Sequence, residues 1–290
     1  MQYFVADDGE HIFYRVTGSG PPLVLLHEWA SNHRIWEPLA GILREDFTVV
    51  RWDARGHGGH PVLGSEGPTV SRMAKDLGAL MDHAGLDRPI VVGASMGALI
   101  LWDYIHYHGC SRLSRICVID QSPRLLTDAT WNLGIYGDWP RERDAEFVGA
   151  LETDFVETVL RLIAFGHNRQ ARESYEADGP GTKRLRAYLA TLDPVPLVAT
   201  WKSLIEADYR PVLPTVTVPA LLVYGSESNY YGIATALYVE RTMPKATLVI
   251  YEGADHSPHV CQPRRFIADL KRFAGIGYDS AAGSTGTAAV

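Results

Sequence analysis

The 290-residue sequence has few cysteines, and their positions exclude several classes of protein. Cys110, Cys117 and Cys261 are the only three, and none stands at a CxxC or metal-ligand spacing. A sparse, odd set is typical of free thiols in a reducing compartment, not of a disulfide framework. We therefore expect a cytoplasmic protein that holds no metal ion.

The sequence also lacks long apolar runs and an excess of positive charge. No segment approaches the roughly 18 apolar residues of a membrane span. The N-terminal segment MQYFVADDGEH has no basic region followed by an apolar stretch, as a signal peptide would have. The formal net charge is -7, whereas phosphate binding needs a basic face. We expect a small-molecule substrate, no nucleic acid and no membrane partner, and we leave a homodimer open.

The chain contains short apolar runs in place of long ones. Six of them alternate with amphipathic stretches, at residues 22–27, 47–53, 89–94, 115–120, 219–225 and 246–252. Continuous apolar runs of this length suit the strands of a parallel sheet that is covered on both faces. Residues 71–85 and 96–109 carry helical periodicity, so the alternation predicts a mostly parallel, doubly wound α/β sheet. Residues 3–18 predict an antiparallel hairpin at its edge.

One interval, residues 122–218, contains no strand-like run. Apolar residues on nearly one helical face lie there instead: Phe147, Leu151, Phe155, Val159 and Leu162. We interpret the interval as a helical cap inserted between two parts of an α/β core, residues 1–121 and 219–275. Residues 276–290 are rich in Gly, Ala, Ser and Thr and predict a disordered tail.

The strongest motif is Gly93-Ala94-Ser95-Met96-Gly97, a G-x-S-x-G between a predicted strand and a predicted helix. In this context the motif makes a sharp turn that exposes the serine hydroxyl at the carboxyl end of the sheet. The N–H of Met96 then lies at a helix N-terminus, where it can stabilise a developing oxyanion. Any glycine-rich turn can match the motif by chance, so the order of the other motifs decides its meaning.

Four segments resemble, in chain order, the motifs of the α/β-hydrolase superfamily: residues 21–36, 51–60, 91–99 and 248–266. They match its oxyanion segment, its D-x-R-G-x-G turn, its nucleophile elbow and its late histidine loop. The resemblance covers nearly the whole chain and implies an α/β-hydrolase fold with Ser95 as nucleophile. It is not specific to a substrate.

The resemblance also implies roles for several of the 11 histidines of the chain. His256 occupies the place of the catalytic base, after the last predicted strand. His27 commonly lies beside the oxyanion loop in the family, where its role is usually structural, and His259, three residues beyond the base, is expected to pack or bind near the pocket. We place both among the candidate substrate-binding residues. His57 and His60 belong to the turn after Asp53, which we assign to structure.

The acid that should orient His256 is missing from its usual place. The loop after the fifth apolar run reads Ser226-Glu227-Ser228-Asn229, and Ser228 stands where the family's aspartate would be. Asp120 ends the preceding apolar run, and neighbouring strand ends of a parallel sheet can reach the same histidine. An unpaired carboxylate at that strand end would be costly. We favour Asp120 as the acid, with Glu227 as the alternative.

A second departure is Glu28, because the family most often has glycine after the histidine of its oxyanion segment. We expect the N–H of Trp29 to join that of Met96 in the oxyanion hole. The preferred interpretation is that Glu28 turns away and is held by an arginine: Arg34, Arg51 or Arg55. The alternative is that Glu28 lines the pocket and serves a substrate with a positive or hydrogen-bond-donating group.

These features predict a cofactor-independent serine hydrolase that cleaves a small to medium, largely apolar or aromatic ester or lactone through an acyl-enzyme. We expect pocket-lining aromatic residues from the start of the cap, namely Trp131, Tyr136 and Trp139. The alternatives on the same fold are carbon–carbon bond hydrolysis, perhydrolysis and cofactor-free dioxygenation of a heteroaromatic ring. A non-catalytic small-molecule receptor is the alternative outside the enzymes.

Overall fold

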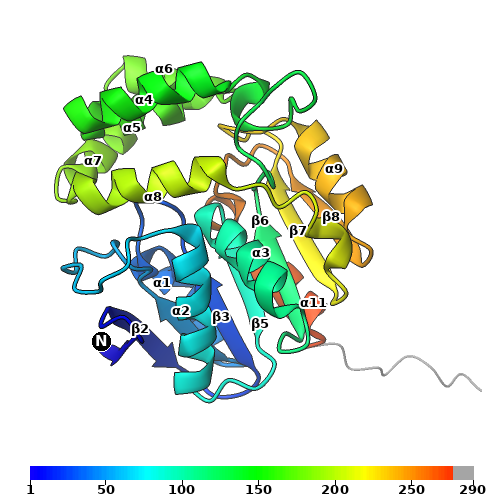
Figure 1. Ribbon diagram of the computed structural model, residues 1–290. Coiled ribbons are helices and arrows are strands. Elements are labelled where there is room, and N and C mark those ends of the chain that lie inside the picture. Colours follow the sequence, from blue (N-terminus) through cyan, green and yellow to red (C-terminus); the bar gives the residue numbers. More distant parts are fainter. Residues whose placement is uncertain (277–290) are drawn as a thin grey trace, which may run out of the picture.

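The computed structural model describes residues 1–276, which form an eight-stranded sheet with helices on both faces (Figure 1). The strands are β1 (Gln2–Val5), β2 (His11–Thr17), β3 (Pro22–Leu26), β4 (Thr48–Trp52), β5 (Ile90–Ala94), β6 (Arg115–Ile119), β7 (Ala220–Gly225) and β8 (Ala246–Tyr251). Their order across the sheet is β1-β2-β4-β3-β5-β6-β7-β8. Strands β3 to β8 run parallel, and β1 and β2 add an antiparallel hairpin at one edge. The predicted fold class is confirmed.

The apolar runs are continuous because the sheet is buried on both sides. In β3, Val24 and Leu26 pack in the larger apolar cluster, whereas Leu23 and Leu25 pack in the smaller one on the opposite face. Helices α2 (Val70–His83), α3 (Met96–His108) and α9 (Ile233–Thr242) contribute to the larger cluster. Helices α1 (Glu37–Leu43) and α11 (Pro263–Ala274) cover the other face (Figure 1).

Local signals fix where these helices begin and end. The side chain of Thr69 caps α2 by accepting a hydrogen bond from the N–H of Arg72. Helix α3 ends at Gly109, and α11 ends at Gly275 with φ of 78°. Glycine adopts this left-handed conformation without a side-chain clash, so it terminates α11 there.

Five helices lie between β6 and β7: α4 (Arg141–Thr153), α5 (Phe155–Ala164), α6 (Arg169–Glu176), α7 (Pro180–Leu189) and α8 (Pro194–Glu206). They form a layer across one end of the sheet, with α8 nearest to the strands (Figure 1). The short α10 (Pro258–Cys261) follows β8. Between β6 and β7, extended pairing is limited to two isolated bridges, Arg124 with Asp208 and Asp128 with Trp131.

The apolar residues that we expected on one helical face belong to two helices. Asp154 separates α4 from α5 with a non-helical backbone (φ −145°, ψ 85°), and its side chain accepts the N–H of Glu157. Phe147 and Leu151 therefore lie on α4, whereas the other three lie on α5. The expectation of one face is wrong because an aspartate competes for the backbone and starts a new helix.

Two further expectations from the sequence concern the C-terminal segment and membrane-spanning helices. Apart from Ile276, the expected disordered tail lies outside the described residues. Among the helices of residues 1–276, none combines the length and the apolar character that crossing a bilayer requires.

Candidate active site

Ser95 stands at the junction of β5 and α3, in a backbone conformation that is unfavourable for a residue with a side chain (φ 50°, ψ −117°). The flanking glycines make this turn sterically feasible. A Cβ atom on Gly93 would lie 2.5 Å from the carbonyl carbon of Gly97, and one on Gly97 would lie 2.6 Å from the carbonyl oxygen of Leu26. The G-x-S-x-G spacing thus follows from the close packing of strand, turn and helix.

Two backbone N–H groups beside Ser95 are available to a ligand. Met96 is the first residue of α3, where an N–H has no partner within the helix. Within residues 1–276, the N–H of Trp29 donates no hydrogen bond. Both residues line the same pocket as Ser95. Whether the two N–H groups serve one oxygen atom is part of the function proposed below.

His256 lies on the loop after β8 and contacts the end of β6. Its Nδ1 atom is 3.3 Å from Oδ1 of Asp120, which is fully buried and also has a positive φ (43°). Asp120 accepts two further hydrogen bonds, from the N–H of Gly225 at 2.9 Å and from the hydroxyl of Ser228 at 2.8 Å. Three donors therefore compensate for the burial of this carboxylate.

Ser228 occupies the loop position at which the sequence comparison with the superfamily expects the acid. Its hydroxyl donates to Asp120 and accepts the N–H groups of Tyr230 and Tyr231, each at 3.3 Å. Glu227 is exposed, and within residues 1–276 its side chain makes no hydrogen bond. The structure thus brings Asp120, and not Glu227, into contact with His256.

The environment of His256 favours its protonated form. Burial lowers the pKa of His256, but the hydrogen bond and charge of Asp120 and the charges of Glu28 and Asp255 outweigh burial and raise it. The second ring nitrogen, Nε2, is buried and has no hydrogen-bond partner within residues 1–276. His256 and Ser95 line one pocket, so this nitrogen is available for proton transfer there.

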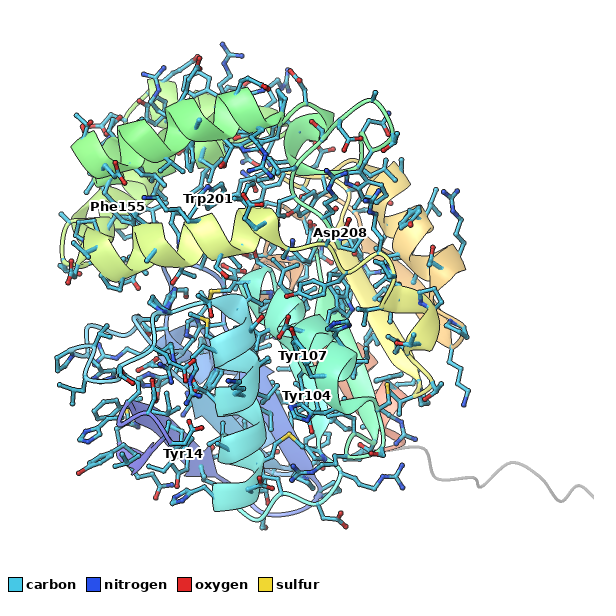
Figure 2. All side chains as sticks on the ribbon, viewed as in Figure 1. Tyr14, Tyr104, Tyr107, Phe155, Trp201 and Asp208 are labelled. Carbon is cyan, nitrogen blue, oxygen red and sulfur yellow. The ribbon has the colours of Figure 1, made fainter. Side chains whose placement is uncertain are left out.

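The pocket has a volume of about 540 Å³ and lies between the strand ends and the helices above them. Its wall is mainly apolar, with these aliphatic residues from α3, α5, α7, α8 and the connecting loops: Met96, Leu99, Leu125, Ile135, Val159, Leu162, Ile163, Leu185, Leu189 and Leu204. Trp201 adds an aromatic ring and points from α8 toward α4 (Figure 2), where its ring lies 4.7 Å from that of Phe147. Such a wall suits an apolar ligand.

Glu28 lines this pocket, and its Oε1 accepts a hydrogen bond of 2.7 Å from the hydroxyl of Ser257. Burial raises its pKa, opposed by the charge of His256. The preferred expectation, that an arginine holds Glu28 away from the pocket, is wrong. Arg55 is engaged by Asp8 and Asp76 instead, with contacts of 2.7 and 2.6 Å.

Two histidines expected near the substrate lie outside the pocket wall. His27 is fully buried; its Nδ1 lies 2.7 Å from the carbonyl oxygen of Glu28, and its Nε2 accepts the N–H of Ala54. His259 is also fully buried and packs against Trp36, with ring centroids 4.6 Å apart. Both are therefore corrected to structural residues.

The three aromatic residues expected in the pocket also lie outside it. The indole of Trp131 donates to the carbonyl oxygen of Arg124, and that of Trp139 donates to Asp144. The hydroxyl of Tyr136 donates to the carbonyl oxygen of Leu162. Each polar group finds a partner within the helical layer, and this pairing fixes the rings away from Ser95. Their expected substrate-binding role is corrected accordingly.

Several pocket residues were not identified from the sequence. The ring of Tyr230 lies 4.4 Å from that of His256, and Tyr231 accepts a hydrogen bond of 3.0 Å from Gln121, which follows Asp120. The available signal was their position: Gln121 directly follows Asp120, and the two tyrosines lie on the loop after β7. Within residues 1–276 no cluster of three or more His, Cys, Asp or Glu side chains is arranged to hold a metal ion.

Comparisons with known proteins agree with this fold. The family model described as "Alpha/beta hydrolase family" matches residues 23–270. A pimeloyl-(acyl-carrier protein) methyl ester esterase of Vibrio vulnificus (strain YJ016) is 29% identical over 266 residues, covering 91% of this chain and 98% of that protein. A non-heme haloperoxidase of Rhodococcus erythropolis is 27% identical, covering 94% and 99%. The structure of the esterase EaEST from Exiguobacterium antarcticum superimposes with a TM-score of 0.81 at 20% identity, covering 94% and 98%, which shows a shared fold.

Proposed function

Because the chain belongs to the alpha/beta hydrolase family, we propose that it hydrolyses carboxylic esters or lactones with Ser95 as the nucleophile. The observation that carries the proposal is the contact of 3.3 Å between His256 and Asp120 at the pocket that Ser95 lines. Serine needs a base for activation, and that base needs an oriented partner. The relatives named as esterases support the same reaction class.

The proposed reaction proceeds in two steps. The hydroxyl oxygen of Ser95 attacks the ester carbonyl carbon while Nε2 of His256 takes the hydroxyl proton. Asp120 stabilises the resulting imidazolium, and the N–H groups of Trp29 and Met96 donate to the oxyanion. His256 passes its proton to the leaving alcohol, and an acyl-enzyme remains. A water molecule, deprotonated by His256, then attacks the acyl-enzyme and releases the acid.

The lining of the pocket supports a substrate of small to medium size with an apolar or aromatic acyl or alcohol group. The mainly aliphatic wall contributes by burying apolar surface, and the volume of about 540 Å³ accommodates a ligand of this kind. A carbon–carbon bond hydrolase of diketo acids is the weaker proposal. Such a substrate carries a carboxylate, and Glu28 in the pocket wall would repel it.

The test is hydrolysis of p-nitrophenyl butyrate and labelling by a fluorophosphonate probe, comparing the wild type with Ser95→Ala. We expect the wild type to hydrolyse the ester and to react with the probe, and the variant to do neither. Retained turnover by Ser95→Ala would favour chemistry that needs only the His256–Asp120 pair, such as cofactor-free dioxygenation. A wild type that neither hydrolyses the ester nor reacts with the probe would favour a non-catalytic small-molecule receptor.

A further inference from the structure

Glu28 is an unusual wall residue for a pocket that is otherwise almost free of charge. Among the described residues that line the pocket, it is the only carboxylate. The described residues supply one side-chain hydrogen bond to it, from Ser257. When His256 is neutral, as its proposed role of base requires, the other basic side chain of the described pocket wall is the exposed Arg34, so a ligand that brings a positive charge would stabilise this partly buried carboxylate.

Aromatic rings stand beside this carboxyl group. The indole of Trp29, the next residue, is fixed by a hydrogen bond of 2.9 Å to the carbonyl oxygen of Leu197 and lies 5.0 Å from the ring of Trp201. Tyr230 lines the same pocket and lies against His256. Burial raises the pKa of its hydroxyl, and the charges of Tyr136 and Glu28 raise it further. The faces of tryptophan and tyrosine rings attract cations, above all quaternary ammonium groups.

One other charged residue lines the pocket besides Glu28 and His256. Arg34 belongs to the wall but is exposed, so water screens its charge. While His256 is neutral, Glu28 is the less exposed of the two remaining charges in the described pocket wall, so a bound molecule experiences a negative potential beside it.

We propose that the enzyme selects esters that carry a cationic ammonium group, held by Glu28 and by the rings of Trp29, Trp201 and Tyr230. This inference rests on the proposed ester hydrolysis and adds the charge class of the substrate. The cation replaces the missing partner of the carboxylate, while the aliphatic wall takes the remainder of the molecule.

The experiment compares two esters of the same shape, acetylcholine and 3,3-dimethylbutyl acetate, in which carbon replaces the charged nitrogen. The enzymes are the wild type, Glu28→Gln, which keeps the acceptor for Ser257, and Glu45→Gln, which removes an exposed carboxylate that does not line the pocket. We expect Glu28→Gln to lower kcat/KM for acetylcholine by about tenfold or more. Because Glu28→Gln can change turnover of both esters through His256, the readout is the ratio of the two kcat/KM values, which should fall about tenfold in Glu28→Gln and stay unchanged in Glu45→Gln.

A binding measurement keeps the inference independent of catalysis. Calorimetry should show that the wild type binds choline more tightly than 3,3-dimethyl-1-butanol, and that Glu28→Gln loses this preference. Equal binding of the two alcohols, or equal effects of Glu28→Gln on both esters, would overturn the inference. The proposed ester hydrolysis would still be supported if the wild type hydrolyses p-nitrophenyl butyrate. Absence of that turnover would remove the proposed function and leave choline binding to decide the inference.

Discussion

The hydroxyl of Ser228 donates a hydrogen bond of 2.8 Å to Asp120, from the loop position at which related enzymes are expected to carry the acid. The loop that lacks an aspartate therefore still contacts the carboxylate beside His256, because its serine donates to an aspartate at the end of the neighbouring strand. The ends of β6 and β7 are adjacent in the sheet, with Ile119 paired to Val223. This adjacency permits the acid to stand on either strand without moving His256.

The first prediction separates the two candidate acids. Asp120→Asn keeps the shape of the side chain but removes the charge that stabilises the imidazolium, so we expect kcat to fall by about 10³-fold or more. Glu227→Gln changes an exposed side chain and should leave kcat within about twofold. Steady-state hydrolysis of p-nitrophenyl butyrate measures both variants. A large loss of kcat in Glu227→Gln with little loss in Asp120→Asn would assign the acid to Glu227.

The second prediction exchanges the acid between the two strands. In Asp120→Asn with Ser228→Asp, the new carboxylate stands at a position that already contacts Asp120, so it should reach His256. We expect the double variant to be at least about tenfold more active than Asp120→Asn alone. Ser228→Asp alone places two carboxylates together, which raises one pKa and should lower activity. A double variant no better than Asp120→Asn would contradict the proposed geometry.

The third prediction concerns the pH profile of kcat/KM. Neutral His256 is the proposed base, and its pKa lies above the ordinary value of 6.5. The rate should therefore fall as the pH falls through a midpoint above 6.5. Glu28 is one of the charges that raise this pKa, so Glu28→Gln should move the midpoint to lower pH. The exposed control Glu45→Gln should leave it in place, and an unchanged midpoint in Glu28→Gln would argue against the coupling.

The fourth prediction concerns stability. Burial lowers the pKa of His259 to about 3, so between this value and 6.5 the unfolded chain binds a proton that the folded protein does not. The contribution of a neutral His259 is complete above pH 6.5 and is lost as the pH falls below it, by about 2 kcal/mol between pH 7 and pH 5. His259→Leu should therefore show a smaller drop in the free energy of unfolding over this range.

Denaturant unfolding at pH 7 and pH 5 measures this difference. The control is His106→Leu, which removes an exposed histidine and should leave the pH dependence of the wild type unchanged. Equal drops for the wild type and His259→Leu would show that His259 becomes protonated within the folded protein.

The sheet and the elbow could be predicted because short-range constraints specify them. A strand buried on both faces must be apolar throughout, and the runs at residues 22–27 and 89–94 show this directly. The turn at Ser95 needs glycine at positions 93 and 97, since any side chain there would meet backbone atoms. The choice of Asp120 likewise followed from the adjacency of parallel strand ends.

The pocket wall could not be predicted in the same way. Trp131, Tyr136 and Trp139 follow Asp120 closely in the chain, yet their polar groups bond within the helical layer and hold the rings away from Ser95. Trp201 and Tyr230 reach the pocket from far along the chain. Proximity in sequence does not determine which face of a loop or helix a ring covers.

By itself, then, the sequence determined the parallel sheet, the serine turn and the candidates for base and acid, because each depends on neighbours along the chain or on strand order. The tertiary structure decided the environment of Glu28, whose partner Ser257 is 229 residues away in the chain. It also decided that Ser228 serves Asp120 and which aromatic rings border the pocket. These outcomes depend on side chains that meet only after the helices close over the strand ends, where packing and hydrogen bonding select among alternatives that the sequence leaves open.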